Sequence, residues 1–166
     1  VADLVPLDHN NRILLSQGLA RIRAGQCCPG VQALLQVAGR PQERIAASDM
    51  GYVVGPRLNA AGRLEDMSIG IACLLSDDLT EARALAARLD ALNRERRAIE
   101  SDMRDEALAE LSALALDEGA ALPTGLCLYQ PHWHQGVVGL VASRVKEKLH
   151  RPVIAFAAAG EDELKG

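Results

Sequence analysis

The sequence predicts an α/β chain that is mostly helical at first, continues as one long helix, and ends in a β–α–β unit. No glycine or proline occurs between residues 79 and 115, which favours one uninterrupted helix there. Apolar runs at 125–129 and 153–157 flank a helical pattern at 137–149, the spacing expected of parallel strands joined by a helix. We therefore expect three parts, 1–75, 76–118 and 119–166.

The early helices are marked by their apolar spacing and by their breakers. Leu15, Leu19 and Ile22 share one face of a helix over 10–23, which Gly25 should end. Pro29 suits the first position of a second helix, which Gly39 should close. The polar run before the first helix is expected to supply its cap from Asp8 or Asn10 and to leave His9 exposed.

Two further short helices are expected before the long one. Ser48 can cap a helix that runs to Val54 and that Gly55-Pro56 should end. Ser68 can cap the next helix, with Ile69, Cys73 and Leu74 as its buried set.

The long helix carries apolar stripes at both ends, and residues 93–97 between them are polar all round. We expect this centre to be a solvated face, and the helix to be a bridge between two domains. Its charges predict two favourable pairs four residues apart, Asp90 with Arg94 and Glu100 with Arg104.

Composition excludes several classes of function. The chain is 49% hydrophobic but only 2% aromatic, so it has few rings for a base-stacking platform. Its net charge of −4 means that any binding to nucleic acid must use a local basic patch. No nucleotide-binding glycine loop and no bilayer-length apolar run is present, so we expect a cytoplasmic protein without a membrane partner.

The four cysteines indicate neither zinc nor a disulfide framework, because no pair has Cys-x-x-Cys spacing. Cys27, Cys28, Cys73 and Cys127 are expected to be reduced thiols, mostly in the core.

Residues 55–64, GPRLNAAGRL, are the most informative stretch for function. Arg57 and Arg63 carry planar guanidinium groups suited to phosphate, and Asn59 can both donate and accept hydrogen bonds. The functional interpretation is a rigid cationic loop for a phosphate-bearing ligand. The competing interpretation is a helical corner whose arginines pair with carboxylates such as Glu65 and Asp66.

A second candidate lies at the start of the β–α–β helix, in the run 132–136, HWHQG. Backbone amides at a helix start attract anions, His134 could donate to a ligand, and Gly136 would let that ligand approach. Simple helix capping explains the same residues equally well. Asp3 lies in an apolar, strand-like context, where a carboxylate is costly unless it is paired or binds a metal.

These motifs together resemble the DHH phosphoesterases, and among them the exonucleases of single-stranded DNA. The resemblance rests on VADLVPLD at 1–8 with NNR at 10–12, on GPRLNAAGRL at 55–64, and on HQGVVGLVASR at 134–144 with RP at 151–152. It covers essentially the whole chain in the right order. It implies the end of a DHH domain, a long linking helix and the start of a DHH-associated domain, with DNA running between the two domains.

The resemblance also implies an activity and roles for single residues. The family degrades single-stranded DNA from the 5′ end with manganese or magnesium. Asp3 would be a catalytic metal ligand, and Arg57, Asn59 and Arg63 would hold DNA phosphates. His134 and Gly136 fall in the motif that opens the associated domain and would contribute to substrate binding.

The chain departs from the family in lacking an Asp-His-His triplet and the earlier aspartate motifs. Because two-metal cleavage needs several carboxylates and histidines, we expect an internal piece of a longer enzyme that is inactive alone. Two alternatives stay open. One is a related phosphodiesterase of short oligonucleotides or cyclic dinucleotides, and the other is a non-catalytic nucleic-acid-binding or protein-interaction module.

Overall fold

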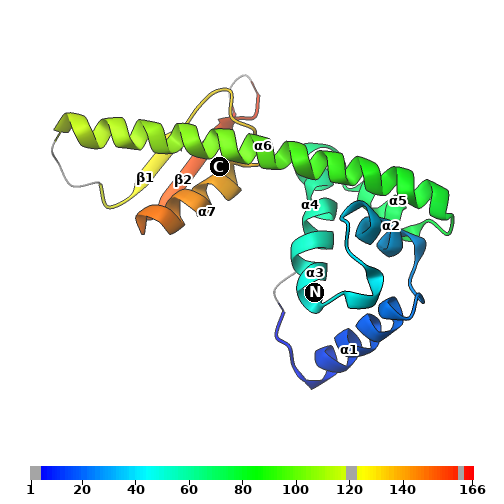
Figure 1. Cartoon of the computed structure of the whole chain (residues 1–166). Coiled ribbons are helices and arrows are strands. Elements are labelled where there is room, and N and C mark those ends of the chain that lie inside the picture. Colours follow the sequence, from blue (N-terminus) through cyan, green and yellow to red (C-terminus); the bar gives the residue numbers. More distant parts are fainter. Residues whose placement is uncertain (1–4, 119–122, 161–162) are drawn as a thin grey trace. The chain divides into compact units, whose positions relative to one another are not determined.

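The computed structural model describes residues 5–118, 123–160 and 163–166 (Figure 1). Its contacts separate two compact units, Val1–Arg94 and Glu95–Gly166, and the boundary falls inside the long helix. Among the described residues, no helix is both long enough and apolar enough to cross a membrane.

Between residues 5 and 94, the regular elements of the first unit are all helices. Its elements are α1 (His9–Arg23), α2 (Pro29–Val37), η1 (Gln42–Arg44), α3 (Ala47–Asp49), η2 (Met50–Val54), α4 (Gly55–Leu64), α5 (Ser68–Leu75) and the first half of α6 (Leu79–Glu118). The core that these helices share is aliphatic, as the composition requires. Its fully buried large side chains include Leu34, Leu35, Ile45 and Leu89.

The ends of the first helices follow the sequence signals. The Asp8 carboxylate accepts a hydrogen bond from the Asn11 backbone N–H at 2.8 Å, so Asp8 is the cap of α1, and His9 is exposed. Gly25 and Gly39 follow the ends of α1 and α2 with φ of 79° and 65°, the left-handed conformation that glycine adopts without a steric cost.

The helix expected to stop at Gly55-Pro56 does not stop there. The backbone of Gly55 is helical, with φ −52° and ψ −48°, so the chain runs from α3 through η2 directly into α4. Proline removes an N–H and crowds the preceding turn, and η2 is a π-helical turn placed immediately before Pro56. This wider turn makes room for the proline ring. The cationic loop expected at 55–64 is therefore helix α4.

The centre of α6 is solvated on one face, as expected, because Arg94, Glu95 and Arg97 are exposed, but it is not polar and solvated all round. Asn93 is 1% exposed, and the Arg96 side chain is 12% exposed. The predicted Asp90–Arg94 pair is confirmed at 3.3 Å. The predicted Glu100–Arg104 pair is wrong, because Arg104 contacts Asp105 instead, at 2.9 Å.

The second unit contains the rest of α6 and the expected β–α–β unit. The elements after α6 are β1 (Leu126–Tyr129), α7 (Val138–Leu149), β2 (Val153–Ala158) and β3 (Leu164–Lys165). Strands β1 and β2 are parallel, with Leu126 opposite Val153, and β3 pairs antiparallel to β2. The buried face of the sheet and the inner face of α7 supply this core, through Leu126, Leu128, Ala155, Val141 and Val145.

The four cysteines are all free thiols, as expected, but they are not mostly in the core. Cys73 is buried and Cys27 is half-buried, whereas Cys28 and Cys127 are exposed. Burial raises the pKa of the Cys73 thiol above its ordinary value, and nearby Cys28 raises it further. The pKa of Cys27 is raised by burial and by Cys28 in the same way.

Candidate nucleic-acid interface

Helix α4 holds the three polar residues that the sequence singled out, but it does not bring them together. Arg57 is largely buried, with 13% of its side chain exposed, whereas Asn59 is exposed. Arg57 and Arg63 are six residues apart, which places them roughly 120° apart around a helix. Asn59 and Arg63 are one turn apart and therefore lie on the same face of α4.

The Arg57 guanidinium is held from two sides within the first unit. Its Nε donates to Asp90 Oδ1 at 2.9 Å, and its Nη1 donates to the Val53 carbonyl at 2.7 Å. Asp90 lies on α6, and its other carboxylate oxygen pairs with the exposed Arg94. For Arg57, the alternative of pairing with Glu65 or Asp66 is wrong, because its carboxylate partner is Asp90. Glu65 pairs with Arg88, and Asp66 accepts from the Ser68 backbone N–H.

The candidate metal ligand Asp3 lies outside the described residues. Within residues 5–118, 123–160 and 163–166, no group of three or more histidine, cysteine, aspartate or glutamate side chains is arranged to hold a metal ion. The described residues therefore do not by themselves form a two-metal centre, because such a centre needs several of these ligands around its two metal ions.

The second candidate, the turn that precedes α7, is tied down by its own backbone. The His134 carbonyl accepts hydrogen bonds from the N–H groups of Val137 at 2.9 Å and Val138 at 3.3 Å. Its ring Nδ1 accepts from the Gly136 N–H at 3.1 Å. The cap residue of α7 is Val137, and no side chain caps this helix, so His134 holds the turn before α7 rather than capping α7 itself. The hydrogen bond from Gly136 fixes the orientation of the His134 ring.

The same turn is attached to α6 by carboxylates that the sequence analysis did not single out. Glu106 Oε2 accepts from Trp133 Nε1 at 2.7 Å and lies 3.0 Å from His132 Nε2. Gln130 donates to Glu110, one turn further along α6. The hydrogen bond from Trp133, and then the contact with His132, lowers the pKa of the Glu106 carboxyl below its usual range.

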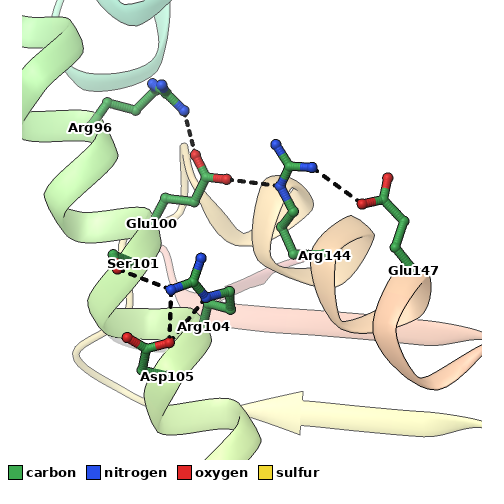
Figure 2. Close-up of polar contacts among 7 residues, drawn as sticks. All are labelled: Arg96, Glu100, Ser101, Arg104, Asp105, Arg144 and Glu147. Atoms are coloured by element: carbon green, nitrogen blue, oxygen red, sulfur yellow. Dashed lines mark hydrogen bonds and ion pairs between the residues drawn. The ribbon is translucent and has the colours of Figure 1, made fainter.

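A charged network joins α6 to α7 in the second unit, as Figure 2 shows. Glu100, only 14% exposed, accepts from both Arg96 and Arg144, and Arg144 also contacts Glu147 at 3.2 Å. The hydrogen bond to Glu100, and then that to Glu147, raises the pKa of the Arg144 guanidinium above its ordinary value. Sequence spacing could not reveal this pair, because Glu100 and Arg144 are 44 residues apart.

The comparison with known proteins gives a single answer. The chain is 60% identical over 166 residues to the single-stranded-DNA-specific exonuclease RecJ of Salmonella typhimurium. The match covers all of this chain and 29% of that relative. The chain matches a segment of RecJ. This segment is less than a third of the length of that relative. No family model matches the chain.

The solved structures agree with the RecJ match. The Thermus thermophilus RecJ structure with Mg²⁺ has a TM-score of 0.78 at 35% identity, over 95% of this chain and 24% of that one. The structure of the same RecJ with Mn²⁺ has a TM-score of 0.79 at 36% identity, over 95% and 22%. These likenesses confirm the α/β class, with a mostly helical chain and a small sheet.

Proposed function

We propose that this chain is part of a metal-dependent exonuclease that degrades single-stranded DNA from its 5′ end, in DNA repair and recombination. The end-to-end identity of 60% to RecJ carries this proposal. The three sequence motifs lie within the matched region in the family's order. We place the whole protein in the cytoplasm, where such DNA is processed.

Two surfaces of the chain would meet the DNA. On α4, Asn59 and Arg63 share one face and would contact phosphate oxygens directly. Arg57 would act with its guanidinium preset by Asp90, so little side-chain freedom is lost when a phosphate binds. In the turn before α7, His134 would donate to the DNA, and Gly136 would allow it to approach.

The metal would be manganese or magnesium, since RecJ structures contain one or the other. Asp3 would be one of its ligands, and the remaining ligands would come from parts of the enzyme outside this chain. When bound, the metal would supply an activated water and would neutralise charge at the scissile phosphate. We therefore expect residues 1–166 alone to have no nuclease activity, and digestion of single-stranded DNA by this piece would refute that expectation.

The test compares the full-length protein with its Arg63→Ala variant on a 5′-labelled single-stranded oligonucleotide. We expect a KM increase of about tenfold, and a salt dependence of binding that is shallower by about 0.7, the value for one phosphate contact on a single strand. Arg83→Ala is the matched control, because Arg83 is an exposed arginine that contacts Gln36. Equal effects of the two substitutions would contradict a specific role for α4.

The same assay distinguishes the alternative activities. Preference for dinucleotides or cyclic dinucleotides over long strands would favour the related phosphodiesterases. Salt-dependent binding without any metal-dependent cleavage by the full-length protein would favour a binding module.

A further inference from the structure

Glu106 organises the turn that carries His134. One oxygen of its carboxylate accepts from the Trp133 indole at 2.7 Å and contacts His132 Nε2 at 3.0 Å. Trp133 is only 3% exposed, so its ring anchors the turn and its indole N–H needs a hydrogen-bond acceptor within the protein. Glu106 supplies that acceptor.

The anchored turn leaves His134 with one orientation and one available donor. Its Nδ1 accepts from the Gly136 N–H, so in the neutral ring the proton resides on Nε2. Nε2–H can then donate to an anionic oxygen. If the turn were displaced, the His134 ring would lose this orientation, and its proton would no longer be held on Nε2.

Glu106 and His134 also face the same shallow cavity of about 300 Å³. Its lining consists of Ile99, Asp102, Met103, Glu106, His132 and His134. The two carboxylates repel phosphate, so Glu106 is badly suited to touch the DNA backbone itself. Its contribution to binding must pass through the histidine turn.

We propose that Glu106 is a positioning residue for His134, holding the turn 130–136 so that His134 Nε2 faces a phosphate oxygen of the substrate. This inference rests on the proposed function, which assigns His134 to the DNA. It adds a residue outside all three sequence motifs.

The experiment is a double-mutant cycle in the full-length protein with a single-stranded oligonucleotide as substrate. We expect Glu106→Ala and His134→Ala each to raise KM about tenfold with little change in kcat, since both would lose the same contact. The double variant should show about the same KM as either single variant, because Glu106 acts only through His134. Glu106→Gln should restore KM to within about threefold, since its amide oxygen can accept from Trp133.

Two further variants protect the test against simple misfolding. Trp133→Phe keeps the ring in the core but removes the indole N–H, and it should raise KM as Glu106→Ala does. Asp105→Ala removes a neighbouring exposed carboxylate that contacts Arg104, and it should leave KM unchanged.

The possible failures are distinguishable. If His134→Ala raises KM but Glu106→Ala and Trp133→Phe do not, the positioning role is overturned and the proposed function stands. If the two KM effects multiply in the double variant, Glu106 acts independently of His134, and the inference is wrong. If His134→Ala has no effect while Arg63→Ala does, the assignment of His134 falls and this inference falls with it. If Arg63→Ala also left KM unchanged, the proposed function itself would be contradicted.

Discussion

Arg57 on α4 and Asp90 on α6 form a largely buried ion pair, with Nη2 of the arginine 2.9 Å from Oδ1 of the aspartate. Their side chains are 13% and 19% exposed. The pair attaches the arginine-bearing helix to the long helix within the first unit. Arg57, which the sequence suggests as a phosphate-binding residue, therefore also has a structural role in holding α4 against α6.

Loss of Asp90 should destabilise the first unit. Asp90→Ala leaves the Arg57 guanidinium without its carboxylate, and we expect a cost of about 1–3 kcal/mol in the free energy of unfolding. Arg94→Ala removes only the exposed partner of Asp90, with 73% of its side chain exposed, and should cost less than about 0.5 kcal/mol. Urea unfolding of the two variants measures the difference, and equal costs would contradict the buried pair.

Two glycines should respond oppositely to alanine. A Cβ at Gly30 would lie 2.1 Å from the Cys73 carbonyl oxygen, so Gly30→Ala must separate α2 from α5. A Cβ at Gly18, inside α1, would meet nothing within 4 Å. We expect Gly18→Ala to stabilise by about 0.5–1 kcal/mol and Gly30→Ala to destabilise by more than about 2 kcal/mol. Hydrogen exchange of the α1, α2 and α5 peptides checks both, and tolerance of Gly30→Ala would contradict the close approach.

The Glu100 network predicts unequal effects of two glutamates on α7 packing. Glu100→Ala removes the shared acceptor of Arg96 and Arg144, so two guanidinium groups lose a carboxylate at once, one of them largely buried. We expect a loss of about 1–3 kcal/mol, seen as faster hydrogen exchange in α7. Glu147→Ala, at a position with 58% of the side chain exposed, should cost less than about 0.5 kcal/mol. A larger effect at Glu147 would show that Glu100 is not the centre of the network.

The lowered pKa of Glu106 predicts a loss of stability in acid. A carboxyl whose folded pKa lies below its unfolded value, about 4.3 for glutamate, stabilises the fold above that value. The contribution should therefore decline below about pH 5 and disappear once the pH passes below the folded pKa. Unfolding midpoints between pH 6 and 3, compared with Glu106→Gln, isolate the contribution. Parallel pH profiles would contradict it.

The thiols should react in two classes. Exposed Cys28 and Cys127 should be modified first by a thiol-specific disulfide reagent at pH 8. Cys27 and Cys73 should react more slowly, because their raised pKa values reduce the fraction of thiolate and because burial limits access of the reagent. Mass spectrometry of the labelled peptides gives the order, and early labelling of Cys73 would contradict its burial.

The sequence predicts features whose causes are local. The breaks at Gly25 and Gly39 and the Asp90–Arg94 pair were predictable from neighbouring residues, the cap was narrowed to Asp8 or Asn10, and the order strand, helix, strand predicted the parallel pairing. Gly55-Pro56 shows the limit of this approach, since breaker residues predict a stop and the π-helical turn before Pro56 carries the helix through. The stop was wrong because a wider turn satisfied the backbone locally.

Tertiary structure decides the partners of the charged side chains. Arg57 with Asp90, Glu100 with Arg144, and Glu106 with Trp133 join positions 33, 44 and 27 residues apart. No periodicity records such a pairing, because it depends on how helices dock rather than on how each one forms. The sequence by itself determined the helices, the β–α–β unit and the motifs of a DNA-processing enzyme. The packing of α6 against its neighbours decided which of the charges are buried partners and which face the solvent.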